Sequence, residues 1–212
     1  MSPRENSVRH LANFYTVVSG LALTMAIFRL VDERGQILPF QLPTFLLCIA
    51  FLSTLLPFYH GALRHLDVTY VEIAPSQGEP KAGAFLADFV ILFVESCLFI
   101  VLAVKITEPV TFTLVFGGLM LFDAIWGFLA HLAFSGPKKG KQELTWAKIN
   151  FVTLLVIFAF LYTEGLLDNL KAPVQPLTVA LVLFVIALAR TVVDYWFSWA
   201  HGYYSWSERP TS

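Results

Sequence analysis

Six long apolar segments occupy most of this 212-residue chain, and no other feature constrains its fold as strongly. Crossing a bilayer takes roughly 20 consecutive apolar residues. Inside lipid, every backbone N–H and C=O must be paired within the protein, so apolar segments of this length must form helices. The chain is 57% hydrophobic and only 14% charged, whereas a soluble domain carries about 25% charged residues. The predicted fold class is therefore an all-α integral membrane protein with six transmembrane helices.

The helix boundaries follow from the apolar segments and from the prolines near their ends. We expect helices at about 11–30, 43–65, 84–105, 109–134, 145–166 and 176–203. Pro43, Pro109 and Pro176 stand where a helix can begin without losing a hydrogen bond. Pro57 interrupts the second helix and would free a backbone carbonyl near the middle of the membrane. Six spans use about 120 residues, so we predict one six-helix transmembrane domain over residues 1–212, without a second, water-soluble domain.

The distribution of lysine and arginine predicts the orientation, because cytoplasmic loops of membrane proteins are enriched in both residues. If both termini are cytoplasmic, that side carries Arg4, Arg9, Arg64, Lys81, Lys138, Lys139, Lys141, Lys148 and Arg209. The opposite side then carries only Arg29, Arg34, Lys105 and Lys171. We therefore expect both termini in the cytoplasm and a multi-pass protein of a bacterial-type inner (plasma) membrane. All five tryptophans then lie toward the cytoplasmic side, where an interfacial aromatic belt accounts for most of them.

A short recurring motif suggests internal repetition. The dipeptides Asn13-Phe14, Asp88-Phe89 and Asn150-Phe151 each lie near the predicted cytoplasmic start of an odd-numbered helix. The even-numbered helices each end near a histidine, namely His65, His131 and His201. The chain would then consist of three helical hairpins related by an approximate repeat. Such repeats are common in transporter folds, and the substrate often binds at their interface.

Three ionisable residues lie near mid-depth in the predicted helices: Glu95, Asp123 and Arg190. Placing one such group there costs at least about 2.5–3.5 kcal/mol on insertion scales, so these groups are kept where they pair, line a wet cavity or have a function. Arg190 between two carboxylates would form a charge-assisted cluster. Two interpretations stay open: the cluster is part of an ion pathway, or Arg190 simply joins three helices.

Helical spacing extends this polar site toward the cytoplasm. Arg190 and Asp194 share a face of the sixth helix, and Asp88 shares a face of the third helix with Glu95. We expect a polar funnel that opens to the cytoplasm and closes near Glu95, Asp123 and Arg190. The residues expected at its cytoplasmic opening are His60, Arg64, His65, His131 and His201. For the first three of these, snorkelling to the membrane interface is the alternative interpretation.

Motifs for metal binding and catalysis are missing from the sequence. Paired metal ligands such as His-Glu-x-x-His do not occur, nor does Gly-x-Ser-x-Gly or a glycine-rich phosphate loop. We therefore assign no catalytic and no metal-ligating residue, and the sequence leaves any cofactor, haem included, undetermined. Cys48 and Cys97 fall inside predicted helices and are interpreted as small apolar side chains rather than a disulfide. We interpret Gly117-Gly118 as a site of close helix packing.

The leading functional hypothesis is a channel or transporter for a small ion, a proton or another cation, and it rests on the buried charges. The residues assigned to the ion pathway are Glu95, Asp123, Arg190, Asp194 and Asp88. One alternative is a membrane enzyme with a metal, haem or acid–base site at the cytoplasmic interface. Another is a membrane scaffold or sensor subunit. The net charge of −1 argues against nucleic acid; we expect membrane lipids as partners, and self-association into a homo-oligomer stays open.

Overall fold

The computed structural model describes residues 3–31, 36, 39–72, 82–133, 139–163 and 175–200. Their elements are α1 (Pro3–Phe28), α2 (Leu42–Leu66), the π-helical turn η1 (Asp67–Glu72), α4 (Ala82–Val104), α5 (Pro109–Ala133), α6 (Lys139–Thr163) and α7 (Pro176–Ala200). Within these residues the fold is all-helical. Six of the helices are long and apolar enough to cross a membrane. The predicted fold class, an all-α membrane protein with six transmembrane helices, is thereby confirmed.

Several helix ends differ from the predicted boundaries. α5 and α7 begin at Pro109 and Pro176, as predicted. Proline is tolerated there because the N–H groups of the first helical turn have no partner within the helix, so the N–H that proline lacks is not missed. α1 and α6 begin earlier than predicted, at Pro3 and Lys139. Their first turns carry polar residues, so hydropathy alone does not identify them as helical. These turns bring polar side chains of α6 next to the bundle interior.

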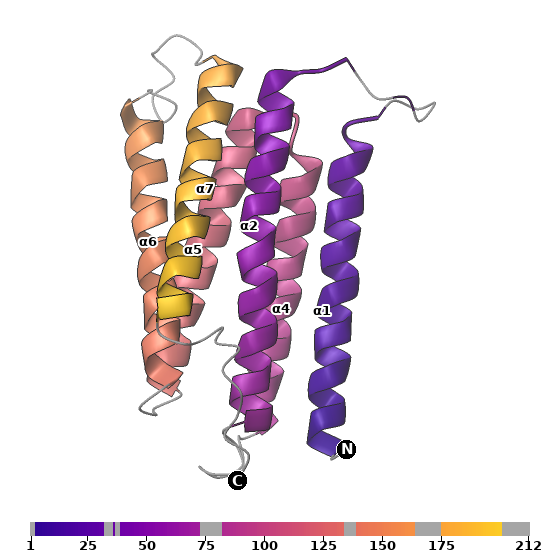
Figure 1. Ribbon diagram of the computed structural model, residues 1–212, viewed down its shortest axis with the longest axis vertical. Coiled ribbons are helices and arrows are strands. Elements are labelled where there is room, and N and C mark those ends of the chain that lie inside the picture. Colours follow the sequence, from indigo (N-terminus) through magenta and orange to yellow (C-terminus); the bar gives the residue numbers. More distant parts are fainter. Residues whose placement is uncertain are drawn as a thin grey trace.

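The six long helices form a ring of contacts, and successive helices along the chain run in opposite directions (Figure 1). Around the ring, α1 contacts α4, which contacts α5, followed by α6, α7 and α2, and α2 contacts α1 again. Further contacts join α2 to α4 and α5, and α5 to α7. α1 begins and α7 ends at the same end of the bundle, the lower one in Figure 1. We call it the lower end.

The most extensive helix contacts join α5 to α6, α2 to α7 and α1 to α4. None of these pairs is one of the predicted hairpins, which would pair α1 with α2, α4 with α5, and α6 with α7. The threefold repeat therefore stays a prediction, as does the cytoplasmic location of the termini. The polar first residues of the repeat motif also differ, since Asn13 is exposed while Asp88 and Asn150 are buried.

An apolar core fills the upper half of the bundle. The early turns of α2, α5 and α7 meet the late turns of α4 and α6 there, and the buried residues include Leu47, Phe51, Phe99, Phe112 and Phe116. The rings of Phe51 and Phe58 each meet Phe99 edge to face, with centroids 6.3 and 5.3 Å apart. Aromatic pairs prefer this geometry. The upper half is thus closed by interlocking apolar side chains.

As predicted, Pro57 leaves a backbone carbonyl of α2 without its helical hydrogen bond, and a side chain of α7 donates to this carbonyl instead. Proline has no N–H, so the carbonyl of Ser53, one turn earlier, loses its helical partner. The hydroxyl of Thr191 on α7 donates to that carbonyl at 2.5 Å. This bond satisfies a polar group that lipid cannot satisfy and ties α7 to α2 where α2 lacks its own hydrogen bond.

We expect Thr191→Val to lower the free energy of unfolding by about 1 kcal/mol, because it leaves the Ser53 carbonyl without a donor. The measurement is thermal unfolding of the purified protein in detergent. Thr24→Val is the matched control, since the Thr24 hydroxyl donates to Gly20 of its own helix. Equal stability of the two variants would contradict the role assigned to Thr191.

Candidate functional site

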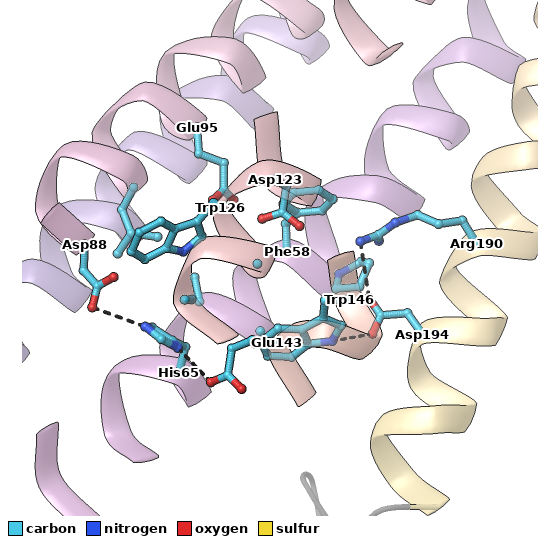
Figure 2. Close-up of a pocket in the computed structure, with 16 residues that line it drawn as sticks. Phe58, His65, Asp88, Glu95, Asp123, Trp126, Glu143, Trp146, Arg190 and Asp194 are labelled. Atoms are coloured by element: carbon cyan, nitrogen blue, oxygen red, sulfur yellow. Dashed lines mark hydrogen bonds and ion pairs between the residues drawn. The ribbon is translucent and has the colours of Figure 1, made fainter. Parts of the chain in front are cut away.

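A cavity of about 50 Å³ lies between α2, α4, α5, α6 and α7. Five carboxyl residues line it: Asp88, Glu95, Asp123, Glu143 and Asp194. Its basic residues are His65 and Arg190 (Figure 2). Glu95, Asp123 and Arg190 come from the middle of their helices, whereas His65, Asp88 and Glu143 lie near the lower end. The cavity therefore extends from mid-bundle toward the lower end, below the apolar core.

All five residues assigned to the ion pathway from the sequence line this cavity, and so does His65. The other residues predicted for the opening do not all join them. His60 is exposed, and its Nδ1 is 2.7 Å from the hydroxyl of Tyr195. Arg64 and His131 are partly buried and lie outside the cavity lining. His201 lies outside the described residues.

Arg190 organises the inner part of the cavity, but its partners differ from the predicted ones. Its Nε donates to Asn150 Oδ1 at 2.9 Å, and Asn150 Nδ2 in turn donates to Asp123. Its Nη2 lies 3.4 Å from Asp194 Oδ2. Within the described part of the chain, Arg190 makes no direct ion pair with Asp123 or Glu95. The predicted three-residue cluster is thus replaced by a chain in which an amide bridges cation and carboxylate.

Asn150 can do this because an amide presents an acceptor and donors at once. The guanidinium of Arg190 also lies over the Phe58 ring, with its central carbon 4.4 Å from the ring centroid. An arginine that is stacked on an aromatic face, hydrogen-bonded to an amide and ion-paired with a carboxylate has little freedom to move. α2, α6 and α7 together hold this charge in place, although Arg190 is only 5% exposed.

Glu95 is held by α1 rather than by a cation. The hydroxyl of Tyr15 donates to its Oε1 at 2.5 Å, and both residues are buried. Tyr15 belongs to a second apolar cluster, which packs α1 against α2, η1 and α4 through Val8, Leu11, Leu66, Tyr70 and Leu92. The packing of α1 therefore supplies a neutral hydrogen bond to a buried carboxyl group.

Near the lower end, His65 lies between two carboxyl groups. Its Nε2 is 3.2 Å from Asp88 Oδ2, and its Nδ1 is 3.6 Å from Glu143 Oε1. Tyr70, from η1, donates to the same Oδ2 of Asp88 at 2.5 Å. The edge of the His65 ring meets the Trp126 ring, with centroids 6.4 Å apart. An imidazole in this position can carry a proton between the two acids.

Asp194 is bound by residues of α6 and α7. Its Oδ1 accepts from Trp146 Nε1 at 2.9 Å and from Ser198 Oγ at 3.3 Å. Gln142 donates to Ser198 at 2.8 Å. The Trp146 ring lies against Gly61 of α2, where a Cβ atom would come within 3.4 Å of it. A glycine at position 61 thus leaves space for an aromatic wall of the cavity.

The charges around the cavity do not balance. If all five carboxyl groups are ionised, Arg190 and a protonated His65 neutralise two of them, and three remain without an opposite charge. Unpaired like charges around one cavity are strongly unfavourable in a medium of low dielectric constant. Three of the five carboxyl groups therefore either stay protonated or are balanced by a positive charge from outside the cavity lining. Reversible binding of positive charge is the chemistry that this arrangement supports.

Buried polar atoms without a hydrogen-bond partner are a second indication that the cavity binds a proton, an ion, water or a ligand. Asp88 Oδ1, Glu143 Oε2 and Arg190 Nη1 have no hydrogen-bond partner among the described residues. Asp88 is 1% and Glu143 3% exposed. Buried polar atoms are nearly always paired, so unpaired ones mark places where a proton, an ion, water or a ligand binds. A grouping of three or more His, Cys, Asp or Glu side chains suited to a metal ion is not found in the described residues.

Sequence reasoning did not assign several residues of this site: Tyr15, Tyr70, Trp126, Glu143, Trp146 and Asn150. Glu143 was missed because the apolar pattern places the start of its helix at 145, whereas α6 begins at Lys139. Trp126 and Trp146 line the cavity, so the interfacial-belt interpretation is wrong for these two. It fits Trp196 and Trp199, which are exposed on the outside of α7.

Comparison of the chain with protein-family models, curated proteins and solved structures gives no match. The class that the fold itself defines is the integral multi-pass membrane protein. Any more specific function must come from the chemistry of the cavity, because no related protein supplies it.

The close approach of α5 and α6 depends on Gly127, and this gives a test of how Glu143 is positioned. A Cβ atom at Gly127 would lie 2.9 Å from the Glu143 carbonyl and 3.2 Å from Ala147 Cβ. We expect Gly127→Ala to push α6 outward and to lower the free energy of unfolding by about 1–3 kcal/mol. Thermal unfolding in detergent measures this change.

Gly118→Ala, on the same helix, is the matched control. A Cβ atom there meets nothing within 4 Å, and one at Gly117 makes only ordinary contacts at 3.7 Å. The predicted role of Gly117-Gly118 in close packing is therefore wrong, since the tight contact is at Gly127. A Gly127→Ala protein as stable as Gly118→Ala would contradict this assignment.

Proposed function

We propose that this protein transports a proton or another small cation across a bacterial-type inner membrane, and that the cavity is its binding site. The observation that carries the proposal is the gathering of five carboxyl groups around one buried cavity with only two basic side chains. Ionisable groups are expensive inside a membrane, and those that are kept there commonly form ion or proton pathways.

The apolar upper half favours a carrier over an open channel. A channel needs a continuous polar path, whereas a carrier opens its site to each side in turn. Among the described residues, the ionisable side chains that line the cavity lie between mid-bundle and the lower end, and Phe51, Phe99 and Phe116 are buried above them. Transport would then require the helices to move apart in the upper half. The interrupted α2 at Pro57 is a suitable place for such a movement.

Each group has a role in this proposal. Glu95 and Asp123, at the inner end, carry the proton or cation. Arg190 is the internal positive charge that limits how many cations the carboxyl groups hold, because its guanidinium does not release its proton in proteins. His65, with Asp88 and Glu143, forms the opening toward the lower end.

The test is a flux panel in proteoliposomes with imposed gradients of protons, sodium, potassium and chloride. We expect selective cation flux that Asp123→Asn lowers by at least about tenfold, equivalent to about 1.4 kcal/mol of lost interaction. Asparagine can still accept the hydrogen bond from Asn150, so the variant should fold. Unchanged flux in folded Asp123→Asn protein would overturn the proposal.

Glu108→Gln is the matched control for these variants. Glu108 lies in the turn between α4 and α5, at the opposite end from the cavity, and Lys105 Nζ donates to it at 2.8 Å. That hydrogen bond lowers the pKa of Glu108, so wild type has an ionised carboxylate there. Removing this charge should leave flux unchanged. A flux loss equal to that of Asp123→Asn would show a general effect of surface charge.

A membrane enzyme is the second candidate, favoured by His65 lying between Asp88 and Glu143. A histidine held by a carboxylate is a common general acid or base. This candidate predicts turnover of a lipid or other membrane-soluble substrate that is lost in His65→Asn protein. Absence of both flux and turnover in folded protein would favour the scaffold or sensor hypothesis.

A further inference from the structure

We infer that His65 is the proton carrier near the lower end of the cavity, and that the ion this protein transports is the proton. The inference rests on the proposed transport function and deepens it by naming the transported ion and the residue that passes it on. Three features of the structure lead to it: the position of the imidazole between two carboxyl groups, the unpaired oxygens of those groups, and the permanent charge at the other end of the cavity.

The imidazole of His65 connects Asp88 with Glu143. Its Nε2 lies 3.2 Å from Asp88 Oδ2, and its Nδ1 lies 3.6 Å from Glu143 Oε1 (Figure 2). The ring separates the two carboxyl groups, so a proton passes between them most directly through it. A small side-chain movement brings the longer contact to hydrogen-bond distance. Histidine suits this role because each ring nitrogen can accept or donate a proton.

The same position disfavours a metal cation near the lower end. Hard metal cations take several oxygen ligands that converge on one point. The His65 ring occupies the space between Asp88 and Glu143, so the oxygens of these two residues do not converge. Among the described residues, no three His, Cys, Asp or Glu side chains are grouped in a way that suits a metal ion. A proton needs no such ligand set, because a single lone pair binds it.

The unpaired oxygens of the two carboxyl groups extend the route beyond His65. Asp88 Oδ1 and Glu143 Oε2 have no hydrogen-bond partner among the described residues, although both residues are almost completely buried. The cavity of about 50 Å³ that they line exceeds the roughly 10–15 Å³ that one water molecule needs. Glu95 lies roughly 10 Å deeper along α4 than Asp88, at 1.5 Å per residue. Water bonded to Asp88 can carry the proton over this remaining distance.

The two basic groups of the cavity differ in whether their charge can change. Arg190 keeps its proton, and Asn150 and Asp194 hold its guanidinium in place. His65 is the only histidine among the described residues that line the cavity. An imidazole is charged only while it holds a second proton. The basic group that can pick up and release a proton is therefore His65.

Ionisable groups from the neighbouring elements determine the charge that the His65 ring meets. Asp88 of α4 and Glu143 of α6 contact it directly, and Tyr70 of η1 donates to the same oxygen of Asp88. α5 meets the ring with Trp126, whose indole does not titrate. Because electrostatic attraction falls with distance, the two direct contacts have the largest effect. The other charged residues nearby are Arg64 and Asp67, within two residues along the chain, and Glu95, Asp123, Arg190 and Asp194 of the same cavity.

One passage consists of two proton transfers. With the ring proton on Nε2, a proton from Glu143 bonds to Nδ1 and gives the imidazolium. The imidazolium then releases its Nε2 proton to the Asp88 carboxylate, so one N–H bond forms and one breaks. The ring is left neutral with its proton on Nδ1, and proton exchange with water restores the first tautomer. The reverse order moves a proton toward the lower end.

The experiment measures ion flux by the full-length protein in proteoliposomes under imposed gradients of protons, sodium and potassium. The site variants are His65→Gln, His65→Asn and Glu143→Gln. Their amides donate and accept hydrogen bonds but do not take up a proton. His10→Gln is the matched control, since His10 is exposed on α1. Three site variants are used so that a folding failure in one, detected by gel filtration and thermal unfolding, leaves the others to decide.

We expect wild type to conduct protons, with no sodium or potassium flux above that of protein-free liposomes. Each folded site variant should lose proton flux by at least about tenfold, because proton transfer by a positioned side chain commonly contributes more than this factor. His10→Gln should conduct protons like wild type. Unchanged proton flux in a folded His65 variant would overturn the inference.

Nitrogen-15 NMR of histidine-labelled protein in lipid bilayers gives a readout that a purely structural role would not change. The His65 signals are those missing from the spectrum of a folded His65 variant. We expect the ring nitrogens to change protonation within the pH interval in which wild-type proton flux changes. A ring that keeps one protonation state and one tautomer at every pH at which the protein conducts protons would overturn the inference.

Failure of this inference and failure of the transport proposal give different results. Sodium or potassium flux that depends on Asp123 would refute the proton relay and leave transport in place. Proton flux that depends on Asp123 but not on His65 would do the same. No flux of any ion from folded protein would refute transport, and the relay with it.

Discussion

The position of Arg190 is the constraint on which the arrangement of the cavity depends. A guanidinium cannot lose its proton in a protein, so it must find partners wherever the fold places it. Here Asp194 on α7, Asn150 on α6 and the Phe58 ring on α2 provide them. The amide of Asn150 extends the interaction to Asp123 on α5. One fixed charge therefore joins four helices. The other carboxyl groups of the cavity have other partners: Tyr15 donates to Glu95, and His65 contacts Asp88 and Glu143.

The bundle is divided into two halves with different physical character. In the upper half, apolar side chains of the described residues fill the space between the helices. In the lower half, carboxyl groups and hydrogen-bond donors from five helices line one cavity, and Tyr15 of α1 donates to one of these carboxyl groups from behind. The larger apolar cluster packs in the upper half, whereas the lower half retains buried polar atoms without a hydrogen-bond partner among the described residues. Such local conflicts with good packing are typical of functional sites.

Much of this division could be predicted from the sequence, and the rest could not. Apolar length identifies the six helices, and residue depth with helical spacing identifies Glu95, Asp123, Arg190, Asp194 and Asp88 as one polar region. The bridging role of Asn150 could not be predicted, because it depends on how α6 is rotated against α7. The same holds for Tyr15, whose partner Glu95 is 80 residues away. Glu143 lies in the polar beginning of α6, before the residue at which hydropathy predicts that this helix starts.

The two ends of the cavity differ in how their charge can change. At the inner end, Asp123 and Asp194 share Arg190, whose charge is permanent. At the lower end, Asp88 and Glu143 share His65, and an imidazole is charged only when protonated. The lower end can therefore gain or lose positive charge through the proton on His65, whereas the inner end keeps the charge of Arg190. Because Asp88 and Glu143 both contact this imidazole, its protonation changes the charge that both carboxyl groups meet.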